Sequence, residues 1–262
     1  MKSSSTRNCI EGSSPSVSAK FKNMSKRFVI GDIHGGYKAL IQVLKKSKFD
    51  YKNDQLICLG DVADGWSEVK EIFEELFKIK NLIYIMGNHD EWLYKYLKFG
   101  LLDYMWTSQG GKSTIKSYVD TDDKLKVKHL KFLNDALYYY ISDDNKVFVH
   151  GGFDWKDLIE NQSSQVLIWD RHLIEIARYW DSLDKDRTDN NLKVKEFDEV
   201  FVGHTTTTWL NGKTLPLHYS NVWDIDTGAG WEGVLTIMDI DTKEYWQSDK
   251  VSELYPDEKG RK

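Results

Sequence analysis

The stretch Phe28-Val29-Ile30-Gly31-Asp32-Ile33-His34 joins a short apolar run to a carboxylate and an imidazole. Short runs of β-branched and aromatic residues that end at glycine are typical of buried strands. Side chains alternate along an extended chain, so Asp32 and His34 face the same way and can hold one cation. The stretch therefore predicts a strand whose carboxyl end carries ligand side chains.

Four more blocks repeat this arrangement further along the chain. Each places Asp, Asn or His just after an apolar run, and the blocks are Gly60-Asp61, Gly87-Asn88, His150-Gly151 and Gly203-His204. Helical patterns over residues 37–47 and 67–79 separate the first three blocks, and strands joined through helices are parallel and share one carboxyl end. Ligands of open α/β sheets bind in the crevice beyond that end. We therefore expect six side chains to meet at one place: Asp32, His34, Asp61, Asn88, His150 and His204.

These six side chains supply oxygen and nitrogen ligands and no thiolate. Such a mixture suits Mn, Fe or Zn in a reactive site better than a structural zinc. Asp61 has two carboxylate oxygens and can bridge two ions. The pattern predicts a pair of divalent metal ions, with Mn expected first and Fe, Zn, Ni or Mg as alternatives. Two ions held close together convert a bridging water to hydroxide near neutral pH.

Asn88 is followed by His89, which we expect to face the same crevice without binding a metal ion. If Asp64 holds it, this imidazole can carry a proton to a leaving group. Two alternatives stay open. Asp61 and Asp64 can instead cap a helix that starts near Ser67, and a single histidine is more often a core residue bonded to a backbone carbonyl. No role is expected for the histidines outside these blocks: His129, His172 and His218.

The composition narrows the class of protein. The 262 residues carry a formal net charge of −5, and 40% of them are hydrophobic. This length allows one large domain or two small ones, and the acidic balance argues against a surface that coats nucleic acid. Cys9 and Cys58 are too few for a disulfide framework, which fits a reducing, cytoplasmic setting. We expect a monomer or weak oligomer with no membrane partner and no stable nucleic-acid partner.

The chain divides into three parts. Residues 1–24 are rich in Ser, Asn and Lys and are expected to be a disordered leader. Residues 25–250 form the main domain, with a mostly helical insertion or cap over 92–137, and residues 251–262 are expected to be a loose, charged tail. A second sheet is expected from late strands at 146–150, 200–203, 222–226 and 233–240.

The order Asp-x-His, Gly-Asp-x-x-Asp-Gly, Gly-Asn-His-Asp, His-Gly and Gly-His-Thr resembles the calcineurin-like metallophosphoesterase superfamily. Within it, the chain is most similar to the phosphoprotein phosphatases, and among these to the bacterial and bacteriophage-lambda-type Ser/Thr protein phosphatases. Trp106, the block 167–171 and the block 226–229 add to the likeness. The resemblance implies an α/β fold, a four-layer α/β/β/α sandwich with a helical insertion beside the site, and a catalytic domain over 25–250.

The resemblance also implies a role for each site residue. One metal ion would be bound by Asp32, His34 and Asp61. The second would be bound by Asp61, Asn88, His150 and His204. His89 would be the general acid, oriented by Asp64, and phosphate would be bound by Arg171, Asn88 and His89. The implied activity is hydrolysis of a phosphoester by a metal-bridging hydroxide, with a phosphorylated protein or a small phosphoester as the substrate.

One departure from the family pattern concerns the residue after Asp64. The family usually has Gly-Asp-x-x-Asp-Arg-Gly, whereas Gly65 and Trp66 follow here. Loss of a charge-assisted bond weakens phosphate binding by roughly 1.5–3 kcal/mol, and Trp66 could stack on a base-like substrate. This favours an alternative, a nucleotide-directed hydrolase such as a dinucleoside tetraphosphatase or a phosphodiesterase. A non-catalytic scaffold is a third class, and the complete set of ligands argues against it.

Overall fold

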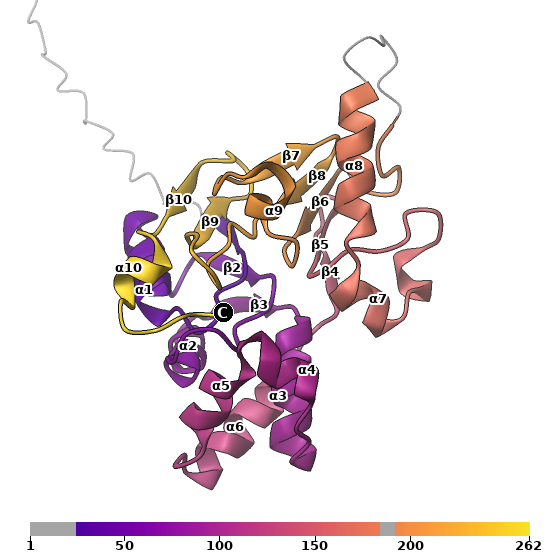
Figure 1. Cartoon of the computed structure of the whole chain (residues 1–262). Helices are drawn as coiled ribbons and strands as arrows, with labels where there is room; N and C mark the ends of the chain where they lie inside the picture. The colour runs from indigo at the N-terminus through magenta and orange to yellow at the C-terminus, as the bar shows by residue number, and fades with distance from the viewer. Residues whose placement is uncertain (1–24, 184–191) are drawn as a thin grey trace, which may run out of the picture.

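The computed structural model describes residues 25–183 and 192–262, which form two five-stranded sheets (Figure 1). The expected leader over residues 1–24 lies outside the described residues. The first sheet has the order β10-β9-β1-β2-β3, with the bounds β1 Arg27–Ile30, β2 Gln55–Cys58, β3 Asn81–Tyr84, β9 Thr236–Asp239 and β10 Tyr245–Gln247. The second has the order β4-β5-β6-β8-β7, with the bounds β4 Tyr139–Ile141, β5 Lys146–Val149, β6 Glu199–Val202, β7 Leu217–Tyr219 and β8 Val222–Asp224.

Three neighbouring strands in each sheet are parallel. In the first sheet β1 pairs with β2 and β2 with β3, so that Ile57 lies opposite both Val29 and Ile83. In the second sheet β5, β6 and β8 run in parallel, with Phe201 opposite Phe148 and Trp223. Parallel strands end on the same side of their sheet. The loops that follow β1, β2 and β3, and those that follow β5, β6 and β8, therefore gather at common edges.

The strand expected at 233–240 belongs to the first sheet, so its expected place in the second sheet is wrong. β9 pairs antiparallel with β1, with Met238 opposite Val29. After β8 the chain thus leaves the second sheet and returns to the first. Apolar residues predict that a strand exists, but they do not show which sheet it joins, because both sheets offer a similar apolar face.

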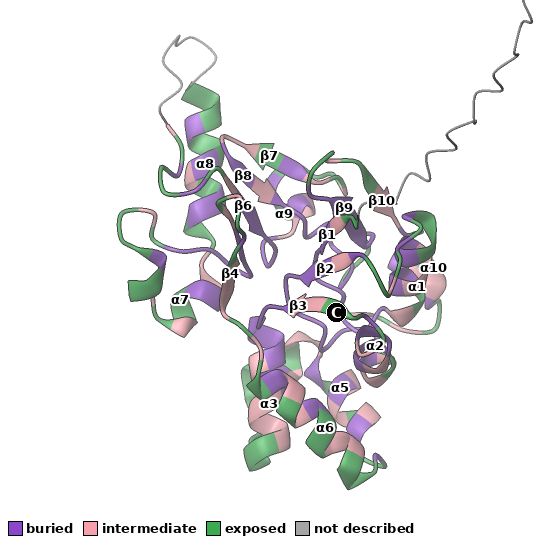
Figure 2. Ribbon diagram, turned by 180° about the vertical axis from the view of Figure 1, so that it is seen from behind, coloured by how far each residue is buried: buried purple, intermediate pink, exposed green. Residues whose placement is uncertain are grey.

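Helices cover the outer face of each sheet. The first sheet packs against α1 (Tyr37–Lys46) and lies near α2 (Val69–Leu76), while the second packs against α8 (His172–Leu183), which follows α7 (Ser164–Trp169). In α1 the buried positions recur every three or four residues, which gives the helix one apolar face toward the sheet. Figure 2 shows this distribution, with buried residues on the strands and on the inner sides of these helices.

Three apolar clusters fill the spaces between these layers. The arrangement confirms the four-layer α/β/β/α sandwich. The central cluster takes side chains from both sheets, and the rings of Phe148 and Phe201 stack there with centroids 4.8 Å apart. A second cluster lies between the first sheet and its helices and includes Leu40 and Ile72. The third lies under α8 and includes Leu173. Burial of apolar area in these clusters is the main force that holds the layers together.

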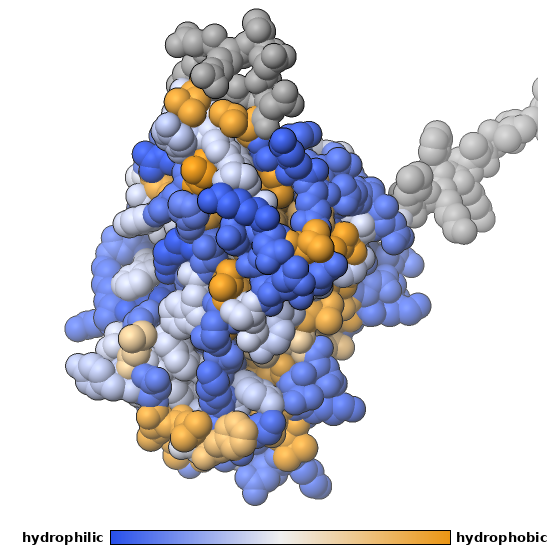
Figure 3. Space-filling view, turned by 90° about the vertical axis from the view of Figure 1, so that its right-hand side faces the viewer, coloured by the Kyte–Doolittle hydropathy of each residue, from blue (hydrophilic) through white to orange (hydrophobic). Residues whose placement is uncertain are grey.

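A helical insertion lies between β3 and β4. It consists of α3 Asn88–Phe99, α4 Tyr104–Trp106, the π-helical turn η1 Thr107–Gly111, α5 Lys112–Tyr118 and α6 Asp123–Asn134. Figure 3 shows a mostly hydrophilic face with a band of apolar groups at the lower end, where this insertion lies, and smaller apolar groups higher up. The remaining short helices are η2 Ile159–Asn161, α9 Thr207–Asn211 and α10 Val251–Leu254. No helix of the described residues is long and apolar enough to cross a membrane.

The C-terminal residues 251–262 differ from the loose tail that we expected. They begin with α10, and the ring of Tyr255 stacks on Trp66 with centroids 5.3 Å apart. The backbone N–H of Arg261 donates to the carbonyl of Gly230 at 2.9 Å. Charged residues dominate this segment, which is why we expected it to be loose. Two of its apolar side chains, Val251 and Tyr255, are nevertheless buried and hold it against the fold. We call residues 255–261 the C-terminal strap.

The strap also changes the start of α2. We expected a helix over residues 67–79, but α2 begins at Val69 and Glu68 occupies the cap position. Ser67 instead donates from its backbone N–H and its hydroxyl to the carboxylate of Glu258, at 2.9 and 2.7 Å. A carboxylate from the distant C-terminus thus holds Ser67 just outside the helix.

Candidate metal centre

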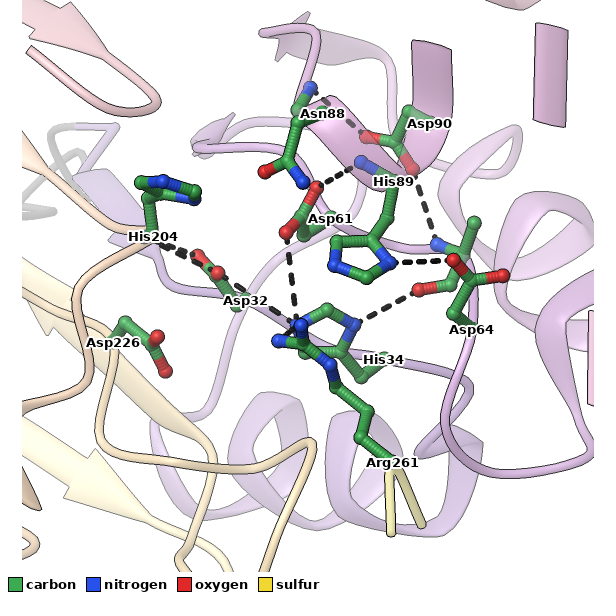
Figure 4. Close-up of polar contacts among 12 residues, drawn as sticks. Asp32, His34, Asp61, Asp64, Asn88, His89, Asp90, His204, Asp226 and Arg261 are labelled. Carbon is green, nitrogen blue, oxygen red and sulfur yellow. Dashed lines mark hydrogen bonds and ion pairs between the residues drawn. The ribbon is translucent and has the colours of Figure 1, made fainter. Parts of the chain in front are cut away.

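The six side chains predicted from the strand ends converge in the structure, and Figure 4 labels all of them except His150. All of them are buried: Asp32, His34, Asp61, Asn88, His150 and His204. Two groups have ligand atoms within 4.8 Å of one another, and Asp61 belongs to both. Its Oδ2 lies 3.7 Å from Nε2 of His34 and 3.4 Å from Nε2 of His150. We call these six residues the ligand cluster.

Backbone carbonyls set the orientation of two imidazoles in the ligand cluster. Nδ1 of His34 lies 2.9 Å from the carbonyl oxygen of Ala63, and Nδ1 of His150 lies 2.8 Å from that of Leu59. A carbonyl oxygen only accepts, so each Nδ1 carries a proton and each ring turns its Nε2 toward the carboxylate of Asp61. Burial, followed by the charge of Arg261, also lowers the pKa of His34 well below its usual value. An imidazole held at Nδ1 by a carbonyl, with Nε2 directed into the cluster, is oriented as a metal ligand.

The buried charges of the ligand cluster also fit divalent cations. Burial, together with the nearby carboxylates of Asp226 and Asp61, raises the pKa of Asp32 well above its usual value. Within the described residues, Nε2 of His204 and Oδ2 of Asp226 are buried without a hydrogen-bond partner. Unpaired buried polar atoms are costly, and carboxylates that repel one another are stabilised by a bound cation. The donor set therefore suits two divalent ions that share Asp61.

Asp226 was not among the residues predicted for the site. It appeared only within a block that adds to the family likeness, although it follows β8 as His204 follows β6. Its Oδ1 accepts a hydrogen bond from the backbone N–H of Gly228 at 2.9 Å. The position after a third parallel strand was the signal that could have revealed it.

Backbone strain is concentrated at the ligand cluster. Eight described residues other than glycine have a positive φ, and four belong to the site: His34, Asp61, Asp64 and His204. A Cβ on Gly87 would lie 2.1 Å from Oδ1 of Asp61, so only glycine allows the backbone this close to the carboxylate. Each such conformation costs roughly 1–3 kcal/mol and persists where the surrounding fold enforces it. The fold therefore tolerates these destabilising backbone conformations, which direct the side chains toward the ligand cluster.

His89 and Asp64 form the pair that the sequence predicted. Nδ1 of His89 lies 2.5 Å from Oδ2 of Asp64, and the backbone N–H of His89 donates to Oδ1 of Asp61 at 2.9 Å. The His89 ring meets the His34 ring edge to face, with centroids 5.0 Å apart. His89 thus faces the ligand cluster without joining either group of ligands.

The helical insertion holds Asp64 in place. Nε1 of Trp106 lies 2.8 and 2.7 Å from its two carboxylate oxygens, and the hydroxyl of Thr114 donates to Oδ1 at 2.7 Å. Thr114 also accepts from the backbone N–H of Asp64 at 2.8 Å. Sequence reasoning included Trp106 only as a point of likeness and missed Thr114, because nothing in a local helical pattern shows that a threonine is buried against a distant carboxylate.

Arg171 lies at the edge of the ligand cluster. Its Nη1 donates to the carbonyl oxygen of His204 at 2.9 Å and to the hydroxyl of Thr205 at 3.1 Å. It faces a pocket of about 630 Å³, which we call the substrate pocket and which is lined by Gln109, Arg171, His204, Thr206, Thr208, Trp209, Trp231 and Arg261. Asn88 lies deeper, with its Oδ1 3.1 Å from Nε2 of His150.

The expectation that Trp66 could stack on a substrate is wrong. Trp66 is buried, its Nε1 donates to the carbonyl of Ala229 at 2.7 Å, and Tyr255 covers its ring. Both the face and the polar edge of this indole are therefore occupied within the protein.

Arg261 approaches the ligand cluster from the C-terminal strap, and sequence reasoning missed it. Its Nη1 lies 3.2 Å from Nε2 of His34, and its Cγ lies 3.3 Å from where a Cβ on Gly65 would stand. An arginine from the end of the chain thus lies beside the position where the family usually has one. No local pattern predicts this, because the contact depends on how the strap crosses the fold.

The chain belongs to the calcineurin-like phosphoesterase family, which residues 26–207 match. It is therefore a metallophosphoesterase, a phosphoester hydrolase of a family that depends on two metal ions. This confirms the superfamily recognised from the strand-end motifs.

Two curated relatives are nucleotide hydrolases. An asymmetrical bis(5'-nucleosyl)-tetraphosphatase, PrpE, from Anoxybacillus flavithermus is 25% identical over 236 residues, which cover 80% of this chain and 88% of that protein. A symmetrical bis(5'-nucleosyl)-tetraphosphatase from Coxiella burnetii is 27% identical over 135 residues, which cover 51% of this chain and 44% of that protein. These names support the nucleotide-directed alternative better than the Ser/Thr protein phosphatase that we expected.

Solved structures share the fold. A proposed diadenosine tetraphosphatase superposes with a TM-score of 0.61 at 15% identity, covering 86% of this chain and 94% of that one. A protein serine/threonine phosphatase from Saccharomyces cerevisiae gives a TM-score of 0.57 at 10% identity, covering 87% and 81%. At these identities the likeness establishes the architecture and does not distinguish the substrates.

Proposed function

We propose that this metallophosphoesterase hydrolyses nucleoside polyphosphates of the dinucleoside tetraphosphate type. The observation that carries the proposal is the substrate pocket, where two guanidinium groups and two indoles stand beside the ligand cluster: Arg171, Arg261, Trp209 and Trp231. Guanidinium groups bind phosphate oxygens in pairs, and an exposed indole stacks on a nucleobase. Trp209 and Trp231 are 66% and 38% exposed, so their rings are accessible.

This combination suits a nucleotide better than a phosphorylated protein. A phosphoserine side chain brings one phosphate and no aromatic ring, whereas a dinucleoside tetraphosphate brings several phosphates and two bases. The tetraphosphatase names of the two relatives support the same choice. A Ser/Thr protein phosphatase remains the competing hypothesis, and the experiment below separates the two.

In this proposal the ligand cluster holds two divalent ions, of which Mn is the first choice because the ligands are carboxylate, amide and imidazole. One ion is held by Asp32, His34 and Asp61. The other is held by Asp61, Asn88, His150 and His204. When bound, such a pair activates water as the nucleophile and neutralises charge on the phosphate. Asp61 would contribute to both because its Oδ2 faces both groups of ligands, 3.7 Å from Nε2 of His34 and 3.4 Å from Nε2 of His150.

His89 is proposed to donate a proton to the oxygen of the leaving group. Asp64 orients the ring by accepting from Nδ1, and Trp106 and Thr114 fix Asp64 in turn. Proton donation matters most when the leaving oxygen is strongly basic, as in an alkyl phosphate. A nucleotide phosphate is a better leaving group, so His89 should matter less for nucleotide substrates.

The test compares three substrates with the Mn-loaded enzyme: diadenosine tetraphosphate, a phosphoserine peptide and bis(p-nitrophenyl) phosphate. Since each additional charge-assisted contact is worth about tenfold or more, we expect kcat/KM for diadenosine tetraphosphate to exceed that for the peptide by at least about tenfold. Chromatography of the products identifies which phosphoanhydride bond is cleaved. A higher kcat/KM for the phosphopeptide would overturn the nucleotide proposal and restore the protein phosphatase.

A further inference from the structure

The guanidinium group of Arg261 lies beside the ligand cluster but forms only long hydrogen bonds there. Nη1 lies 3.2 Å from Nε2 of His34, and Nη2 donates to the amide oxygen of Gln109 at 3.3 Å. Its Nε is buried and has no hydrogen-bond partner among the described residues. Figure 4 shows the side chain reaching from the C-terminus toward His34. A guanidinium whose only hydrogen bonds are long and run to neutral groups keeps donors that a ligand can use.

The C-terminal strap holds this side chain in its direction. Tyr255 stacks on Trp66, and Gly260 packs so closely that an added Cβ would lie 2.9 Å from the Trp66 ring. The guanidinium carbon of Arg261 lies 5.0 Å from the centroid of the Trp231 ring. This cation–π contact also holds the guanidinium in place. A side chain oriented in advance loses little conformational freedom when it binds a ligand.

Arg261 and Arg171 share the need for an anion. Among the described residues neither guanidinium donates to a carboxylate: Arg171 bonds to a carbonyl and a hydroxyl, and Arg261 to an imidazole and an amide. Both line the substrate pocket beside the ligand cluster. Arginine binds phosphate more strongly than it binds neutral acceptors, and its fork matches two oxygens of one phosphate. The anion that fits this pair is therefore a phosphate group of the substrate.

We infer that Arg261 is a substrate-binding residue, which the C-terminal strap supplies in place of the arginine that is missing after Asp64. It binds the phosphate group at the ligand cluster together with Arg171, which lines the same pocket. When His34 binds a metal ion through Nε2, Nη1 of Arg261 loses that partner and is left to bind phosphate. The inference rests on phosphoester hydrolysis at this site and does not require a nucleotide.

The experiment measures inhibition by inorganic phosphate, with bis(p-nitrophenyl) phosphate as the reporter substrate and the full-length chain. Arg261→Met removes the guanidinium but keeps an unbranched side chain over Gly65, and Arg261→Lys keeps the charge without the fork. Loss of a charge-assisted pair should raise the inhibition constant for phosphate by about 10- to 100-fold in Arg261→Met. We expect Arg261→Lys to lie between this variant and the wild type.

The matched control is Lys259→Ala, which removes an exposed cation from the same strap. Because a solvated charge contributes little, its inhibition constant should change by no more than about threefold. Metal content per chain and the thermal midpoint are measured for every variant and should stay at wild-type values.

Two results would overturn the inference. One is an unchanged inhibition constant for phosphate in Arg261→Met. The other is a loss of bound Mn that accounts for all of the weakened inhibition, which would make Arg261 a support for the ligand cluster. Failure of the nucleotide proposal is a separate result, since it appears in the wild-type comparison of substrates and leaves the phosphate measurement intact.

Discussion

The ligand cluster and the substrate pocket beside it are built in different ways. The cluster takes its side chains from the residues that follow parallel strands, and all of them are buried. The pocket takes Arg171 from the link between α7 and α8, Trp209 from α9, Trp231 from a loop and Arg261 from the C-terminal strap. In the proposed function, the topology of the sheets sets the chemistry and peripheral segments select the substrate. Substitutions in the two regions should therefore have different kinetic effects.

The largest effect is expected at the residue that both halves of the ligand cluster share. Asp61→Asn removes the bridging carboxylate, so it should lower kcat on bis(p-nitrophenyl) phosphate by about a thousandfold or more and reduce bound Mn. Steady-state kinetics and elemental analysis of the same sample measure both. Asp143→Asn, which neutralises an exposed carboxylate, is the control. Full activity in Asp61→Asn would refute a shared ligand.

A second prediction separates proton transfer from metal binding within the cluster. His89→Ala should lower kcat on an alkyl phosphate by about 100-fold or more, because its leaving oxygen needs a proton. The loss on p-nitrophenyl phosphate, whose leaving group is stable as an anion, should be much smaller. Bound Mn should not change. Equal losses on both substrates would contradict the role of His89 as the general acid.

A smaller effect of the same kind is expected from the helical insertion. Trp106→Phe removes the indole N–H that lies 2.7 Å from Asp64, which should lower kcat on the alkyl phosphate by about tenfold. The ratio between the two substrates should shift in the same direction as in His89→Ala. Trp155→Phe is the matched control, since Trp155 packs on Trp180 of α8 with centroids 5.0 Å apart, and it should leave the ratio unchanged. If Trp106→Phe changed both substrates equally, the insertion would not act through Asp64.

The smallest effect is expected from a substitution in the substrate pocket, and it should change KM for the nucleotide substrate alone. Stacking of a base on an indole is worth a factor of about ten, so Trp209→Ala should raise KM for diadenosine tetraphosphate by that amount. KM for bis(p-nitrophenyl) phosphate should change little. Tyr179→Ala removes a similarly exposed ring on α8 and serves as the control. An equal KM change for both substrates would show that Trp209 does not select nucleotides.

The same contrast explains what the sequence could predict. Asp32, His34, Asp61 and Asn88 follow strands joined through helices, and that local order is enough to bring them to one edge. Arg261 and Thr114 depend on how distant segments cross, which leaves no periodic pattern. Burial of Trp66 likewise depends on Tyr255, which lies near the other end of the chain.

The sequence also did not show which of the two sheets each strand joins. The residues of β9 show the same apolar character as those of the second sheet, and their pairing with β1 depends on the path of the chain after β8. The departure at Gly65 was visible, but it pointed to Trp66 when the relevant neighbour was Arg261. The missing arginine after Asp64 indicates that one phosphate-binding cation is absent from its usual place. Only the tertiary structure shows that Arg261 of the C-terminal strap lies beside that place.

The central claim is that Asp61 joins two metal sites, and anomalous diffraction from a crystal grown with Mn tests it most directly. We predict two anomalous peaks about 3.5–4 Å apart, one on the side of His34 and the other on the side of His150, with the Asp61 carboxylate between them. A single peak, or two peaks that do not share Asp61, would contradict it.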